Sequence, residues 1–188
     1  MKTSFTIVGL GDVTRTFDDM AREIGDKQAN SKILRPAVKE AMTPVLNAAQ
    51  QNAPVDTGVL RAMLQVEARR PTRKDKRSKY VSETDAVIAT ITTASGKKMA
   101  QWNKALDTEK GRKSVGRRLK KSGLSQEQID KFSGFESDAR AVAQEFGTSR
   151  NPAQPFLRPA LESNAQSTVS RLAAILKRRL EQYKAKQK

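Results

Sequence analysis

The C-terminal part of the sequence carries an apolar stripe at helical spacing, and this stripe limits the fold more than any other feature. Apolar residues recur every three or four positions between residues 159 and 183, which predicts a single helix. At 1.5 Å per residue this helix is about 40 Å long, and we expect part of it to pack against another subunit. The stripe consists of Leu161, Ala165, Val169, Leu172, Leu176, Leu180 and Tyr183.

Other patterns predict a small sheet with helices around it. Residues 12–24, closed by Gly25, and residues 31–52 show helical spacing, with Pro36 in a first turn and Pro44 producing a kink. Alternating or β-branched residues predict strands over 3–8, 62–68, 86–93 and 138–146. The middle two of these strands form an antiparallel pair joined by a charged loop. The expected fold class is α+β: a small antiparallel sheet flanked by helices, with a long C-terminal helix.

Composition favours one domain, residues 1–188, with a modest core. Hydrophobic residues make up 37% of the chain and charged residues 30%. Residues 94–134 break into short helical pieces without a strong stripe, although Ser125 and Gln128 have the spacing of a capping box. We therefore expect residues 94–134 to be a basic insertion between strands, mobile or ordered only by contacts.

The sequence contains neither cysteine nor histidine. Disulfides, thiolate chemistry and Cys/His metal sites are therefore excluded, and the commonest general acid–base side chain is missing. We expect no enzymatic activity and no cofactor. A magnesium-dependent nuclease using carboxylates such as Asp56 and Glu145 stays as an alternative, although no recognisable metal motif pairs them.

No apolar run reaches the roughly 18 residues that a membrane span requires. The first eight residues contain one basic residue and no extended apolar segment after it, unlike a signal peptide. We expect a soluble protein made in a cytoplasm, with no membrane partner.

The formal charge of +16 is concentrated in three segments. Residues 69–79, 97–121 and 171–188 contain 24 basic and four acidic residues, whereas the other 134 residues sum to −4. Such segments are solvated faces or contacts with a polyanion, either DNA phosphates or an acidic protein. The candidate contact residues are Arg69, Arg70, Arg73, Lys74, Lys76, Arg77, Arg112, Lys113, Arg117, Arg118, Lys120 and Lys121.

Two turn motifs flank the predicted sheet. The first follows the helix over residues 31–52, and the second precedes the long C-terminal helix. In both, proline and glycine restrict or permit particular backbone conformations, which indicates that the motifs hold shape. The first motif contains Pro54, Asp56, Thr57, Gly58, Leu60 and Arg61, and the second contains Glu145, Phe146, Gly147, Thr148, Pro155, Phe156, Leu157 and Pro159.

The order and spacing of these motifs resemble the phage tail-completion family, the neck proteins of long-tailed phages that include the minor tail protein Z type. The resemblance covers residues 1–70 and 135–165 and leaves out residues 94–134. It implies a structural virion protein at the head–tail junction, located in the tail or neck and assembled in the host cytoplasm. The implied partners are further copies in a ring, expected to be sixfold, the tail terminator or tail tube, and head-closure or connector proteins.

The charge supports a second function class, a sequence-independent DNA-binding or DNA-packaging accessory protein. No helix-turn-helix, zinc finger or aromatic sheet motif accompanies it. Non-specific contact with genomic DNA is also compatible with the first class, so both alternatives stay open at this point.

Overall fold

The computed structural model describes residues 29–54, 58–79, 81–83, 85–135 and 140–186, and residues 11, 15, 18, 19, 21, 22 and 25 near the N-terminus. The chain divides into two compact units. Unit 1 comprises residues 1–45, 66–90 and 163–188, and unit 2 comprises residues 46–65 and 91–162. The strand expected over residues 3–8 lies outside the described residues. Gly25 has a φ of 80°, as expected of a glycine that closes a helix.

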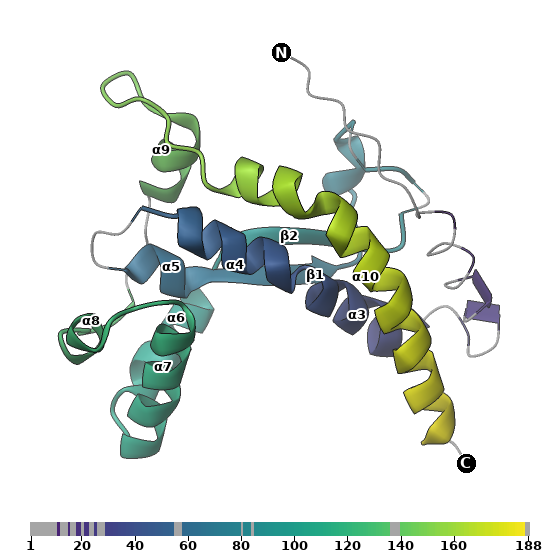
Figure 1. Cartoon of the computed structure of the whole chain (residues 1–188), viewed down its shortest axis with the longest axis horizontal. Coiled ribbons are helices and arrows are strands. Elements are labelled where there is room, and N and C mark those ends of the chain that lie inside the picture. The colour runs from purple at the N-terminus through teal and green to yellow at the C-terminus, as the bar shows by residue number, and fades with distance from the viewer. Residues whose placement is uncertain are drawn as a thin grey trace. The chain divides into compact units, whose positions relative to one another are not determined.

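The core of unit 1 lies between the helices around residue 35 and the C-terminal part of the longest helix. Helix η1 (Ala29–Leu34, a π-helix), α3 (Arg35–Ala41) and α10 (Leu157–Ala185) supply it. Figure 1 shows α3 beside the C-terminal part of α10. The predicted C-terminal helix is thus confirmed. Most of its stripe packs against its own chain within unit 1, where the buried cluster consists of Ala29, Ile33, Leu34, Ala37, Ala41, Ile175 and Leu176.

Ion pairs join the same two helices. The Arg179 Nη2 atom donates to Glu40 Oε2 at 2.6 Å, and Arg178 donates to the other carboxylate oxygen of Glu40. These bonds hold the pKa of Glu40 below its ordinary value. Glu40 therefore binds both of the consecutive arginines of α10.

The helix predicted over residues 31–52 is divided. Helix α3 ends at Ala41, Met42 forms a turn, and α4 (Thr43–Asn52) follows. Pro36 lies in the first turn of α3, as predicted. Pro44 lies in the first turn of α4, where the missing N–H has no helical partner to lose. The predicted kink is therefore a break, placed just before the proline.

The two strands of the sheet are β1 (Leu64–Arg69) and β2 (Ile88–Thr93). The Ala94 amide, just after β2, donates to the Met63 carbonyl, just before β1, at 2.9 Å, as in an antiparallel pair. The predicted fold class, α+β with a small antiparallel sheet and a long C-terminal helix, is confirmed. The predicted start of the first strand is wrong, because Ala62 and Met63 belong to the short helix α5 (Val59–Met63).

Residues 94–134 form three helices of unit 2: α6 (Gly96–Ala105), α7 (Glu109–Lys121) and α8 (Gln126–Asp130). The predicted capping box at the start of α8 is confirmed, with both reciprocal bonds of Ser125 and Gln128 present. The segment also has a buried cluster, which the sequence analysis did not predict. Its ordering on assembly stays a prediction. The cluster consists of Ala62, Met63, Ala94, Met99, Val115, Leu119, Leu124 and Phe135.

The strand predicted over residues 138–146 is wrong. Residues 140–146 form the helix α9 (Arg140–Phe146), and residues 136–139 lie outside the described part of the chain. Val142 and Phe146, which are both largely exposed, are four residues apart and share one face of this helix. The apolar side chains therefore mark the outer face of α9.

Candidate functional site

Glu145 is the central residue of the second motif. Its side chain is buried, and its carboxylate accepts the backbone N–H groups of Phe156 and Leu157 at 2.9 Å and of Arg158 at 3.3 Å. These N–H groups open α10 and have no partner within that helix. Burial raises the pKa of Glu145, but the bonds from Leu157, Phe156 and Arg158 outweigh it, so the pKa lies below its ordinary value. Glu145 therefore caps α10 as a carboxylate.

Arg158 completes this cap from the first turn of α10. Its Nε donates to Glu145 Oε1 at 2.9 Å, and its Nη2 donates to the Glu145 carbonyl at 2.8 Å. The guanidinium also lies over the Phe146 ring, with Cζ at 5.3 Å from the ring centroid. The Arg158 side chain thus binds both the carboxylate and the backbone carbonyl of Glu145.

The segment between α9 and α10 turns tightly. Gly147 has a φ of 76°, and a Cβ at this position would lie 2.8 Å from the Ala153 amide nitrogen. The Thr148 amide donates to the Asn151 carbonyl at 2.8 Å. Phe156 is fully buried, Pro155 is exposed, and Pro159 lies in the first turn of α10, where its missing N–H is tolerated. The second motif therefore builds the turn and cap that start the long helix.

Large apolar side chains are exposed around this cap. Val142 and Phe146 on α9 are 68% and 69% exposed, and Leu161 on α10 is 44% exposed. Leu161 lies one turn beyond Arg158, whose guanidinium lies over the ring of Phe146. We call these three residues the α9–α10 apolar surface. Leu161 belongs to the predicted apolar stripe of the helix, and this part of the stripe is exposed.

The first motif closes the end of α4. Arg61 donates from Nε and Nη2 to the Ala53 carbonyl at 3.2 and 3.1 Å, and from Nη2 to the Gln51 carbonyl at 3.0 Å. Leu60 is buried, and Pro54 follows the end of the helix. Asp56 and Thr57 lie outside the described residues. Arg61 thus binds the carbonyl groups that the helix leaves without partners.

A glycine is required at position 58 of the same motif for a specific steric reason. It has a φ of 72°, and a Cβ there would lie 2.8 Å from Leu124 Cγ. Only glycine combines this backbone conformation with so close a neighbour. The predicted sharp turn at Gly58 is confirmed.

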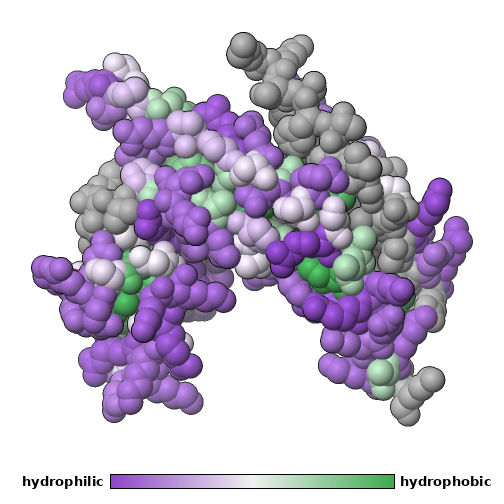
Figure 2. Space-filling model, viewed as in Figure 1, coloured by the Kyte–Doolittle hydropathy of each residue, from purple (hydrophilic) through white to green (hydrophobic). Residues whose placement is uncertain are grey.

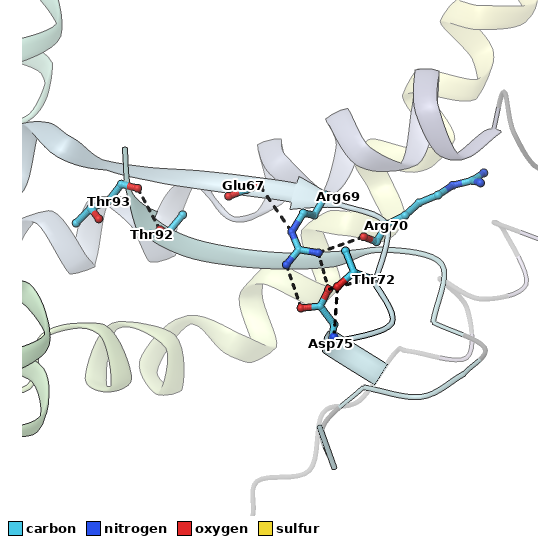
Figure 3. Close-up of polar contacts among 7 residues, drawn as sticks. All are labelled: Glu67, Arg69, Arg70, Thr72, Asp75, Thr92 and Thr93. Atoms are coloured by element: carbon cyan, nitrogen blue, oxygen red, sulfur yellow. Dashed lines mark hydrogen bonds and ion pairs between the residues drawn. The ribbon is translucent and has the colours of Figure 1, made fainter. Parts of the chain in front are cut away.

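Part of the basic loop between β1 and β2 is neutralised internally. Figure 3 shows the Arg69 guanidinium between Glu67 and Asp75. The Nη1 atom of Arg69 donates to Asp75 Oδ2 at 2.6 Å. The bonds from Arg69 and Thr72 hold the pKa of Asp75 far below its ordinary value. Lys76 donates to Glu83 at 2.8 Å. The exposed candidates that remain in this loop are Arg70, Arg73, Lys74 and Arg77.

The basic residues of α7 divide in a similar way. Arg118 donates to the Ala62 carbonyl at 3.0 and 3.1 Å, and its Cζ lies 3.9 Å from the centroid of the Trp102 ring. Burial lowers the pKa of Arg118, which is a structural residue of unit 2. Lys113 pairs with Glu109 at 2.6 Å but is exposed. The exposed cations among the α7 candidates are Arg112, Lys113, Arg117, Lys120 and Lys121.

Asn103 makes a long-range structural contact that was not predicted from the sequence. Its side chain donates to the Phe135 carbonyl at 2.9 Å and accepts the Phe135 amide at 2.7 Å. It therefore fixes a segment 32 residues away, next to the packed rings of Trp102, Phe132 and Phe135. An isolated asparagine in a weakly patterned segment gives no sequence signal for such a contact.

Two further properties concern the part of the chain that the structure describes. No group of three or more carboxylate, histidine or cysteine side chains there is arranged to hold a metal ion. No helix among the described residues is both long enough and apolar enough to span a membrane.

Capped turns, an exposed apolar surface and cations on an outer helix are features of a protein that acts by contacts. Residues 15–147 match the family model described as "Bacteriophage HK97-gp10, putative tail-component". The match covers more than half of the chain, so this protein belongs to the HK97-gp10-like family of phage tail components. It is a structural protein of the virion. Comparison with curated proteins and with solved structures found no match.

The predicted membership of a phage tail family is therefore confirmed. The match spans the first motif and ends at Gly147 in the second, so it covers much of the region on which the predicted resemblance rested. The narrower assignment, to tail-completion proteins of the minor tail protein Z type, stays a prediction.

Proposed function

We propose that this protein is a tail-completion subunit of the minor tail protein Z type, which assembles into a ring at the head–tail junction of a long-tailed phage. In this role it works by shape: copies associate head to tail and close under rotational symmetry, expected to be sixfold. Its other partners are the tail tube or tail terminator on one side and a head-closure or connector protein on the other. The proposed role requires neither catalysis nor a cofactor.

The observation that carries this proposal is the α9–α10 apolar surface in a phage tail component. Val142 and Phe146 are the two most exposed large hydrophobic side chains among the described residues. Such residues are unfavourable in contact with water and are used where a partner covers them. The buried cap at Glu145 holds this surface in place, as expected of a contact that recurs in every copy of a ring.

The test is to remove the apolar surface without disturbing the fold. A Val142→Ser, Phe146→Ser double variant should melt within a few degrees of the wild type, because both side chains are largely exposed. It should sediment as a monomer where the wild type assembles. A phage carrying it should accumulate heads and tails that are not joined.

A matched control replaces two exposed polar residues of unit 2, Lys104→Ser and Asp107→Ser, which leaves the net charge unchanged. The control should assemble and support infectious particles. If the Val142, Phe146 variant also forms closed particles of normal size, viewed down the axis by electron microscopy, the proposed interface is wrong. If the wild type stays monomeric with its tail partners and particles join normally without it, the proposed role is wrong.

A further inference from the structure

A stripe of cations covers the outer face of α7. Lys110, Lys113, Arg117, Lys120 and Lys121 are all exposed, and at 100° per residue they project within an arc of roughly 100°. Val115 and Leu119 on the opposite face are buried in the core of unit 2. Figure 2 shows the side of α7 that faces the viewer as hydrophilic along its length. The helix is thus anchored by one face and presents cations on the other.

Beside this stripe, α7 and α8 border a shallow groove. Lys113, Gly116, Arg117 and Lys120 line it from α7, and Gln126 and Ile129 line it from α8. The lining contains three cations and no carboxylate. The nearby acids have partners of their own: Glu109 pairs with Lys113, Glu127 pairs with Lys131, and Asp130 accepts a hydrogen bond from Gln126. Glu109 thus partly neutralises Lys113, and Arg117 and Lys120 give the groove the positive charge that suits an anion.

Gly116 leaves the floor of this groove open. Glycine is unfavourable inside a helix, and a Cβ at this position would meet nothing within 4 Å, so the protein's own packing does not require it. Gly111 on the same helix is different, because its Cβ would lie 1.9 Å from the Ala105 carbonyl oxygen. Because the fold does not require a glycine at position 116, the uncovered backbone there is suited to the close approach of a ligand.

We propose that this groove and the α7 stripe bind the phosphate backbone of double-stranded DNA without sequence preference. Lys113 and Lys120 are about 10 Å apart along the helix axis, which matches about three phosphates of one strand. Lysine, the main residue of the stripe, is depleted in protein–protein interfaces, so an acidic protein is the less suitable partner.

Single-stranded nucleic acid is also less suitable, because it requires aromatic rings on which bases stack. The Trp102 ring is packed against Phe135, with 4.8 Å between centroids, and Arg118 lies over it at 3.9 Å. The single tryptophan of the sequence is therefore packed against the core of unit 2. The proposed DNA site lies within one subunit, so this inference does not depend on the proposed ring.

The test measures binding of full-length protein to a labelled 30-base-pair duplex by fluorescence anisotropy, over a range of salt concentrations. For three to four neutralised phosphates, the slope of log K against log salt should be about −3. The variant Lys113→Ser, Arg117→Ser, Lys120→Ser should bind at least tenfold more weakly at low salt, with the slope reduced by about 2 to 3. Gly116→Leu, which keeps the charge and fills the groove, should also weaken binding.

A control variant removes the same charge elsewhere. Arg171→Ser, Lys177→Ser, Lys186→Ser replaces three exposed cations of unit 1 and should lose far less affinity. Equal loss in both triple variants would mean that affinity follows net charge alone, which overturns the proposal. So would unchanged binding by the α7 variant, or failed head–tail joining with DNA affinity intact, which would assign the stripe to an acidic protein.

Two further binding measurements test sequence preference and distinguish this inference from the proposed function. Duplexes of different sequence should bind equally, and a clear preference for one sequence would overturn the inference. The Val142→Ser, Phe146→Ser variant, which is expected not to assemble, should still bind DNA with the salt slope of about −3, because it removes no cation. Loss of DNA binding in that variant would place the site in the assembled particle and overturn the assignment to the α7–α8 groove.

Discussion

Glu145 and Arg158 bind each other twice across the turn that precedes α10. The guanidinium donates to the carboxylate at 2.9 Å and to the Glu145 carbonyl at 2.8 Å, while the same carboxylate accepts the first N–H groups of the helix. A buried carboxylate without such donors would be strongly unfavourable. The pair thus joins two residues that are 13 positions apart in the sequence, one on each side of the turn.

Replacing Glu145 by glutamine should destabilise the protein although the two side chains have the same shape. The carbonyl oxygen of the glutamine amide still accepts hydrogen bonds, but its NH2 group only donates, so the N–H groups bound to one of the two carboxylate oxygens lose their acceptor. We expect the free energy of unfolding at pH 7 to fall by about 1–3 kcal/mol, measured by urea denaturation. Arg112→Gln, a change of the same kind at an exposed residue of α7, should leave the stability within about 0.5 kcal/mol.

Acid should destabilise the wild type through Glu145 more than it destabilises this variant. The pKa of Glu145 is lower in the folded protein than its ordinary value of 4.5, so the unfolded chain binds the proton more tightly. The stabilisation is therefore complete above about pH 4.5 and is lost as the pH falls through the lower folded value. Parallel stability profiles of the wild type and Glu145→Gln between pH 3 and pH 6 would contradict this account.

Arg61 should not be replaceable by lysine. Its guanidinium reaches the carbonyls of Gln51 and Ala53 together, whereas an ammonium group cannot reproduce that fork. We expect Arg61→Lys to lose about 1 kcal/mol, which for a chain of this size lowers Tm by about 2–4 °C. Arg112→Lys serves as the matched control, and equal melting of both variants would show that Arg61 contributes only charge.

The two glycines of α7 should respond in opposite directions to alanine. Gly111→Ala places a Cβ 1.9 Å from a backbone oxygen, so the protein should lose about 1–3 kcal/mol or more. Gly116→Ala meets no neighbour and should gain about 0.5–1 kcal/mol from better helix propensity. Thermal melts of both variants decide this, and a loss of stability in Gly116→Ala would refute the assignment of an open position.

Two leucines of α10 should respond differently to replacement by glutamate. Leu176 is fully buried in the core of unit 1, so Leu176→Glu buries an unpaired charge and should leave little folded protein. Leu161 is 44% exposed, so Leu161→Glu should remain folded and soluble but fail to assemble. Circular dichroism followed by sedimentation separates the two effects. Normal assembly by Leu161→Glu would remove this residue from the proposed interface.

Local sequence patterns were sufficient where the structure is decided by neighbours in the chain. Ser125 and Gln128 form their capping box because every group involved lies within four residues. The long C-terminal helix and the turn at Gly58 follow from equally local rules. Periodicity identified the stripe on α10, and most of that stripe lies against the core of unit 1.

Contacts between distant segments account for the misses. Residues 138–146 were predicted to form a strand, and nothing in the local sequence indicates that Val142 and Phe146 lie on the exposed face of a helix. The local sequence also did not indicate which basic residues have partners within the fold. Arg118, for example, donates to the Ala62 carbonyl, which is 56 residues away. The core of residues 94–134 depends on Ala62 and Met63 of α5, so the segment by itself shows only a weak apolar pattern.

The cap at Glu145 has a consequence for any partner that docks on the exposed apolar surface. Phe146 follows the capping residue directly, and Leu161 follows the capped turn, so both side chains are positioned before an encounter takes place. Association then loses less conformational entropy than it would if the partner had to order these segments. A substitution at Glu145 should therefore raise the dissociation constant of that partner, even though the buried carboxylate itself is not part of the contact.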